Sequence, residues 1–300
     1  MSTPTNTPTN TPTSTPTSTP GDYVLACIDG ASLSTAVCDY AAWIARTADA
    51  PLRLLHQLEQ RPQAPIADLS GSIGLGAQEE LLEELTGVEQ QRSRLLMEKG
   101  KLMLAAARTR ALEAGVAAPE TIQRHGRLQE TLVEWENDIR VLVMGVRGSE
   151  HGEGELGAHI ESVIRSLHRP VLVVNTDFVA PRNIMLAYDG GEAARKALAM
   201  IAESPVLRGL HCHVVHVGAD GQGDELLREA CGLLAQAGVS HEGICLNGRL
   251  DDALCAYQGQ HAIDLMVMGA FSHLRIRDLL LGSFTARMLV STKRPLLLLR

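Results

Sequence analysis

The chain has 300 residues, which is too long for one ordinary doubly wound domain and suits two small ones. Its formal net charge is −8, which argues against nucleic acid as a partner and against anionic membrane surfaces, because both need basic patches. Hydrophobic residues make up 45% of the chain but aromatic residues only 3%, so aliphatic side chains and methionine must fill the cores.

Residues 1–20 repeat Thr-Pro-Thr-Asn and then Thr-Pro-Thr-Ser. This composition buries no apolar surface and its prolines oppose helix, so we expect a disordered tail. The N-terminus has neither the basic region nor the apolar core of a signal peptide. No stretch approaches the roughly 18 to 20 apolar residues of a membrane helix. We therefore expect a cytoplasmic protein with no membrane insertion.

Residues 21–175 are predicted to form a first domain in which strands and helices alternate. Short, nearly unbroken apolar runs are typical of strands buried on both faces, and apolar residues on a helical period mark the helices. Residues 59–78, rich in proline and glycine, are expected to form a loop or lid, and the long helix after them is expected to break near Gly87. The expected strands are 23–29, 52–58, 121–124, 139–145 and 170–174, and the expected helices follow Ser32 or Ser34 and span about 79–114, 128–136 and 158–167.

A polar linker, 176–182, leads into a second domain, 183–300, that repeats the same order. Five segments match in register: NIMLAYDGG with YVLACIDGA, HCHVVHV with LRLLHQL, GRLDDALCAY with GRLQETLVEW, IDLMVMGA with IRVLVMGV, and RPLLLL with RPVLVV. A repeat of about 150 residues with alternating strands and helices predicts an α/β fold of two tandem doubly wound domains, each with a parallel sheet. The last strand of each copy is apolar to its end, so we expect the two copies to pair there as an internal dimer.

The six cysteines show neither a CxxC pair nor a disulfide framework spacing, which favours buried, reduced thiols. His211, His213 and His216 lie close together beside Cys212. On a strand His211 and His213 share one face and His216 points to the other, and no second ligand group has a recognisable spacing. We therefore expect a structural or solvent-edge role for these histidines rather than a zinc site.

The segment MGAFSHLRIRDLLLGSFT (268–285) is predicted to be a strand end, a loop and a helix start. Free N–H groups and the helix dipole favour phosphate at such a place. Its spacing is Gly269, two residues, Ser272, nine residues, Gly282-Ser283, which resembles the nucleotide loop of the universal stress protein family. Ser272 stands where that family has a second glycine. The whole of 22–300 resembles a tandem universal stress protein.

This resemblance implies an adenine-nucleotide alpha hydrolase-like fold with five parallel strands in the order 3-2-1-4-5, and ATP or AMP as the ligand. It places Asp189-Gly190 beside ribose or a magnesium ion, Val217 beside adenine, and Gly269 where the backbone approaches the nucleotide. The remaining residues that it assigns to the nucleotide site are Met268, Ser272, His273, Gly282, Ser283, Phe284 and Thr285. Taken singly, Asp189-Gly190 is also ordinary turn chemistry and Gly282-Ser283 an ordinary helix start.

The first copy carries a degenerate version of the same site. Asp29 occupies the position of Asp189, but its loop runs from Gly145 through Gly148 to Gly157, one residue short, and Ala158 replaces the phosphate-binding hydroxyl. The loop also holds three glutamates, which repel a triphosphate. We expect this copy to bind nucleotide weakly or not at all.

Three functions fit these observations. The resemblance implies a regulatory module that binds an adenine nucleotide in the stress response, with a protein partner that the sequence does not identify and with a homodimer as one arrangement. An ATPase or nucleotide transferase is disfavoured, because the chain has no GxxxxGK[ST] loop and no visible pair of nucleophile and base. The third is a nucleotide-free scaffold, for which Ser272 and Ala158 would be signs of lost binding.

Overall fold

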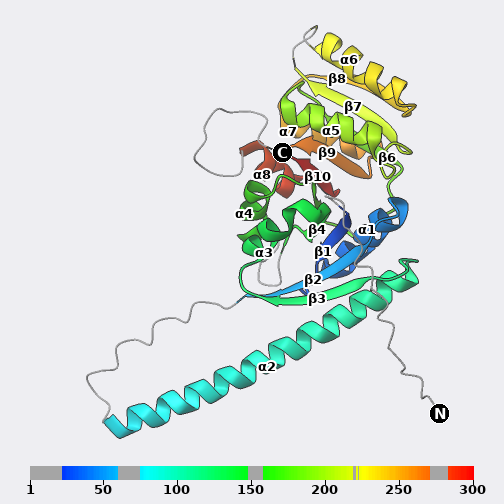
Figure 1. The fold of residues 1–300 in the computed structure, drawn as a ribbon. Coiled ribbons are helices and arrows are strands. Elements are labelled where there is room, and N and C mark those ends of the chain that lie inside the picture. The colour runs from blue at the N-terminus through cyan, green and yellow to red at the C-terminus, as the bar shows by residue number, and fades with distance from the viewer. Residues whose placement is uncertain (1–21, 60–74, 148–157, 219–220, 222, 271–282) are drawn as a thin grey trace, which may run out of the picture.

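The computed structural model describes residues 22–59, 75–147, 158–218, 221, 223–270 and 283–300. Within these residues the chain forms a single ten-stranded sheet, with helices on both of its faces (Figure 1). No helix in this part of the chain is long and apolar enough to cross a membrane.

The elements of the two halves follow one another in the same order. The first half contains β1 (Tyr23–Cys27), α1 (Ser34–Thr47), β2 (Leu52–Leu58), α2 (Leu75–Glu113), β3 (Glu120–His125), α3 (Leu128–Trp135), the 3₁₀ turn η1 (Glu136–Asp138), β4 (Ile139–Gly145), α4 (Ala158–Ser166) and β5 (Val171–Val174). The second half contains β6 (Asn183–Ala187), α5 (Glu192–Glu203), β7 (His211–Val217), α6 (Gly223–Gln236), β8 (His241–Leu246), α7 (Leu250–Gln260), β9 (Leu265–Gly269), α8 (Ser283–Ser291) and β10 (Leu296–Leu299).

The strand order confirms the predicted fold. The sheet runs β3-β2-β1-β4-β5-β10-β9-β6-β7-β8, which is the order 3-2-1-4-5 followed by its mirror image. All pairs within each half are parallel, and the one antiparallel pair joins β5 to β10, with Leu297 opposite Leu172. The two halves therefore meet through their last strands, as expected for an internal dimer whose edge strands satisfy each other.

Two apolar layers cover the sheet. Side chains of β1 alternate between them. Val24 and Ala26 belong to the layer that also contains residues of α1, α2, α5 and α6, whereas Tyr23 and Leu25 belong to the layer that contains residues of α3, α4, α7 and α8. Because both faces are covered, the strands need apolar residues at nearly every position, and this explains why they are visible in the sequence as continuous apolar runs.

Two expectations for the first half need correction. Helix α2 runs unbroken through Gly87, where a glycine in a long exposed helix costs only about 1 kcal/mol and does not break it. The helix also begins at Leu75, inside the stretch expected to be a loop; residues 60–74 of that stretch lie outside the described residues. In Figure 1, α2 extends well beyond the sheet that its second half covers.

The repeat in β2 and β7 is shifted by one residue from the match that the sequence suggested. Val24 of β1 pairs with Leu52, and the equivalent Ile184 of β6 pairs with Cys212 rather than with His211. The shift makes His56 equivalent to His216. Both use Nδ1 in a hydrogen bond to a backbone carbonyl at the end of the neighbouring strand, at 2.6 Å from Ile28 O and 2.9 Å from Tyr188 O.

The six cysteines are free thiols, as expected, but they are not uniformly buried. Cys38 and Cys212 are buried whereas Cys245 is exposed. Burial raises the pKa of Cys27 and of Cys212 to about 12, so these thiols stay protonated and unreactive at neutral pH.

Candidate functional site

Three of the predicted site residues of the second half lie at the carboxyl edge of the sheet. Strand β6 lies between β7 and β9, and Ala187 is level with Val215 on one side and Met268 on the other. Asp189 and Val217 each come two residues after these paired residues, and Gly269 comes one residue after. Three strands that are distant in the sequence thus place the predicted residues side by side.

The chain leaves this edge in opposite directions. After β6 it enters α5, whose Ala194 and Ala197 pack in one apolar layer. After β9 it enters α8, whose Met288 and Leu289 pack in the layer on the opposite face. Open parallel sheets bind ligands where neighbouring strands diverge in this way. The strand pair β6–β9 is such a topological switch point.

Asp189 stabilises the turn that follows β6. Its Oδ1 accepts a hydrogen bond of 2.8 Å from the backbone N–H of Gly191, two residues on. Gly190 has a φ of +74°, a backbone conformation that favours glycine. Asp29 and Gly30 form the same turn in the first half, with a 2.9 Å bond from the Ala31 N–H and a φ of +76°. Turn formation alone therefore accounts for an Asp-Gly pair in both halves.

Gly269 lies against the start of α5. A Cβ at this position would be 2.7 Å from Cβ of Ala193 and 3.2 Å from the backbone N of Ala194. The close approach of β9 to α5 thus requires a residue without a side chain. Met268, by contrast, is buried in the core, so only its backbone faces the edge.

The first turn of α8 lies beyond the same edge. Ser283 is its first residue, Phe284 is half-buried, and Thr285 is buried. Helix α8 is tied to α7 by a 2.9 Å ion pair from Arg287 Nε to Asp251 Oδ2. The hydrogen bond from Arg249 lowers the pKa of the Asp251 carboxyl, and Arg287 acts in the same direction. Ser272, His273 and Gly282 lie outside the described residues.

The first half fills the corresponding place with larger side chains. Gly145 occupies the position of Gly269, but its neighbour is Leu33, whose Cβ and Cδ1 would lie 3.4 and 3.8 Å from an added Cβ. Ser34 donates a 2.8 Å hydrogen bond to Asp29 Oδ1 and accepts one from the Gly30 N–H. Gly148 and Gly157 lie outside the described residues.

Sequence reasoning missed Ala193 and Ala194. These two alanines stand where the first half has Leu33 and Ser34, so the second half presents less side-chain volume and one hydroxyl fewer beside the Asp-Gly turn. The signal was present in the aligned repeats, DGASLS against DGGEAA, where the small residues are on the second copy.

A family model decides the identification. The model described as the universal stress protein family matches residues 22–175 and 218–300, which together make up more than half of the chain. The chain belongs to the universal stress protein family. The second matched segment includes Gly269 and α8 but starts at Gly218, so the family match itself does not include Asp189 or Val217.

Similar proteins match over nearly the whole chain. The universal stress protein Slr1230 of Synechocystis is 36% identical over 284 residues, which cover 92% of this chain and 99% of that protein. The crystal structure of a universal stress protein from Archaeoglobus fulgidus DSM 4304 superposes with a TM-score of 0.70 at 18% identity and covers 93% of this chain and 98% of its own. A protein of unknown function from Pseudomonas aeruginosa PAO1 gives a TM-score of 0.60, again at 18% identity, with 92% of each chain covered.

Proposed function

We propose that this universal stress protein is a cytoplasmic regulatory protein whose second half binds an adenine nucleotide, ATP or AMP, in the stress response. The observation that carries the proposal is the switch point between β6 and β9, where α5 and α8 leave toward opposite faces of the sheet. The residues there that differ from the first half, Ala193 and Ala194, carry smaller side chains than Leu33 and Ser34.

Each residue at this edge has a role in the proposal. The first-turn N–H groups of α8 and the dipole of that helix would stabilise the phosphates. Val217, half-buried at the end of β7, would contact adenine. Asp189 would hold the ribose or a magnesium ion, because Mg²⁺ prefers carboxylate and phosphate oxygens. The magnesium ion would neutralise the charge that a carboxylate brings close to a triphosphate.

The function proposed is binding rather than catalysis. The residues placed at the edge include one carboxylate, Asp189, whose Oδ1 already accepts the Gly191 N–H. The proposal involves no nucleophile and no general base. Slow ATP hydrolysis is the alternative function, and a turnover assay distinguishes it from binding alone.

The test identifies the ligand directly. The full chain is purified, denatured, and the released small molecules are identified by mass spectrometry, and the emptied, refolded protein is then incubated with ATP and Mg²⁺. We expect an adenine nucleotide at near-stoichiometric yield, or saturable ATP binding, without release of ADP. A blank extract together with no saturable ATP binding would leave the scaffold function, and steady ADP release would favour the enzyme.

We also propose that a second copy of the chain packs against α2. Strands β5 and β10 pair with each other within one chain, so neither is free to pair with a second copy. A dimer must therefore use another surface. Val88, Leu95 and Leu102 are 58%, 66% and 71% exposed and lie seven residues apart on α2. A heptad spacing of apolar residues is typical of helices that pair along one face.

The oligomeric state tests this proposal. Light scattering coupled to size-exclusion chromatography is expected to give a dimer for the native chain and a monomer for Leu95→Glu, because a charge on this face prevents the helices from pairing. Val133→Glu, at an exposed valine of α3, is the control and should remain dimeric. A native monomer at high protein concentration would contradict the proposal.

A further inference from the structure

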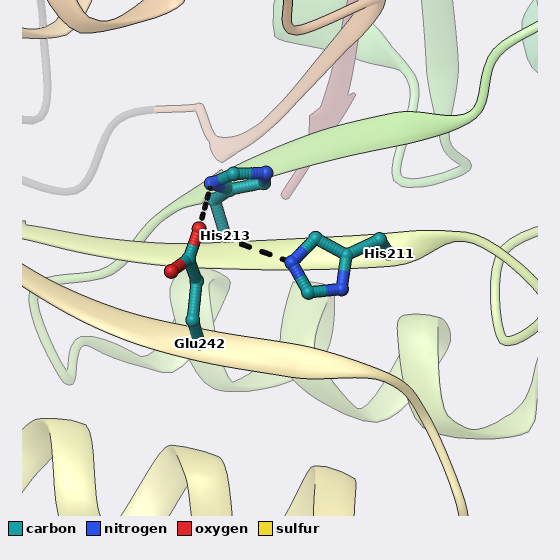
Figure 2. Close-up of side chains that lie close together, drawn as sticks. All are labelled: His211, His213 and Glu242. Carbon is teal, nitrogen blue, oxygen red and sulfur yellow. Dashed lines mark ion pairs between the residues drawn. The ribbon is translucent and has the colours of Figure 1, made fainter. Parts of the chain in front are cut away.

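A second cluster of polar side chains lies away from the nucleotide edge. His211 and His213 point to the same face of β7, and Glu242 reaches them from the neighbouring strand β8 (Figure 2). Glu242 Oε1 is 2.7 Å from Nδ1 of His213 and 3.8 Å from Nε2 of His211. One ligand atom from each of the three residues lies within 4.8 Å of the others.

We propose that His211, His213 and Glu242 bind a divalent transition metal ion, with Zn²⁺ as the best match. Two imidazole nitrogens and one carboxylate oxygen are a ligand set that zinc accepts in sites with an open fourth position. Tetrahedral zinc places neighbouring ligand atoms about 3.3 Å apart. The 2.7 Å contact therefore has to lengthen and the 3.8 Å contact to shorten, each by about half an ångström. The two imidazole nitrogens, which lie within 4.8 Å of each other, have to reach the same spacing.

Both histidines have polar neighbours besides Glu242. Nδ1 of His211 lies 2.7 Å from Ser240 Oγ, which leaves Nε2 to face Glu242. The Tyr257 hydroxyl lies 2.9 Å from His213 Nδ1, and the Tyr257 ring stacks on His261 with centroids 3.8 Å apart. The contact of Ser240 with His211 is of the kind that fixes the ring orientation of a metal-binding histidine, because it uses the ring nitrogen that does not bind the metal. Tyr257 meets His213 at the nitrogen that faces Glu242, so its hydroxyl is within reach of a bound ion instead.

Access and charge also suit a bound ion. The His213 side chain is only 7% exposed, whereas Glu242 is 50% exposed, so the cluster opens to solvent on the β8 side. The Glu242 carboxylate brings a negative charge for the ion to the two imidazoles. A water molecule or the Tyr257 hydroxyl can complete the coordination.

The first half has an arginine–glutamate ion pair at the positions equivalent to His213 and Glu242. Arg53 is level with Glu120 in the same way that His213 is level with Glu242, and Arg53 Nε lies 2.8 Å from Glu120 Oε2. An arginine does not bind metals, since its guanidinium stays protonated. The position equivalent to His211 is Pro51. At these two positions the second half therefore has imidazoles where the first half has a proline and an arginine.

The cluster is independent of the proposed nucleotide site. His213 precedes Val217 by four residues, which on a strand is about 13 Å. The nucleotide edge is at the carboxyl ends of the strands, whereas His211 is the first residue of β7. Loss of one site therefore does not predict loss of the other.

Zinc titration of the full, untagged chain after treatment with EDTA tests the proposal. Isothermal titration calorimetry is expected to show one zinc ion per chain, with no competition from excess Mg²⁺, which prefers oxygen ligands. Co²⁺ as a spectroscopic probe is expected to give the strong visible absorption of a four-coordinate site. Zinc is also expected to raise the melting temperature by mass action.

Matched variants decide whether this cluster is the site. Glu242→Gln and His213→Arg, which installs the ion pair of the first half, are expected to weaken zinc binding by at least about tenfold, the loss that even an outer contact of such a site causes. His241→Gln is the control, because His241 precedes Glu242 on β8 and points to the opposite face. No saturable zinc binding by the native chain, or equal binding by Glu242→Gln and His213→Arg, would overturn the proposal.

Discussion

Replacing Leu298 by alanine is expected to destabilise both halves of the protein together, by about 2–5 kcal/mol. Leu298 lies on β10 opposite Val171 of β5 and is buried in the junction between the halves. Truncation leaves a cavity that close-packed neighbours fill only in part. A loss of this size is a large part of the stability of a typical protein.

The two tryptophans make the coupling measurable. Trp43 and Trp135 are both in the first half, so their fluorescence follows unfolding of that half. Trp43 also lines a cavity with Val206 and Leu297 of the second half and is therefore sensitive to the junction as well. Although Leu298 belongs to the second half, we expect Leu298→Ala to shift the fluorescence transition in urea as far as it shifts the circular dichroism transition. Val290→Ala, at an exposed position of α8, should leave both transitions in place. A fluorescence transition that Leu298→Ala does not move would show that the halves are stable independently.

Replacing Gly269 by alanine is expected to cost about 1–3 kcal/mol and to weaken nucleotide binding. The added Cβ would be 2.7 Å from Ala193 Cβ and 3.2 Å from the backbone of α5, which cannot move aside as the end of a flexible side chain can. The strand end and the helix must separate, and this displaces the edge at which we propose that the nucleotide binds.

The equivalent glycine of the first half is the matched control. An alanine at Gly145 would have its nearest contacts at 3.3 and 3.4 Å, so Gly145→Ala should cost less than Gly269→Ala and leave nucleotide binding unchanged. Urea unfolding and ATP titration of both variants check this difference. Equal losses of stability in the two variants would show that β9 does not pack against α5 more tightly than β4 packs against its own neighbours in the first half.

Most of the fold could be predicted from the sequence, because the strands are buried on both faces. The boundaries expected for 52–58, 139–145 and 211–217 agree with β2, β4 and β7 to the residue. The internal repeat then predicted two domains, and the apolar last strands predicted their junction. The continuity of α2 was not predicted, because in the sequence Gly87 indicates a helix end. A single glycine in an exposed helix lowers its stability only slightly.

The register of the repeat was harder to predict. HCHVVHV and LRLLHQL align by their apolar pattern, but a shift of one residue reverses which face each side chain occupies. The equivalence of His56 with His216 becomes visible only from the pairing of β2 and β7 with their neighbours. The same shift hid the equivalence of Arg53 with His213.

The candidate sites depend on contacts between distant segments. The loop proposed to bind nucleotide, 268–285, was suggested by a motif whose spacing is local, whereas Asp189 and Val217 came from the resemblance to the family. The structure brings Asp189, Val217 and Gly269 to one edge of the sheet. The third residue of the proposed metal site, Glu242, is on another strand, almost thirty residues after His213. No spacing within β7 could predict Glu242, since strand pairing alone places it beside the histidines.

The most direct test of the central claim is the stoichiometry of ATP binding to the full chain and to two charge-removing variants. Asp189→Asn and Asp29→Asn each keep an oxygen that can accept the N–H of the turn, so the fold should be unaffected. We predict one ATP per chain in the presence of Mg²⁺, an affinity lowered by on the order of tenfold or more in Asp189→Asn, and no change in Asp29→Asn. Absence of saturable binding by the native chain, or an equal loss in the two variants, would contradict a nucleotide site in the second half.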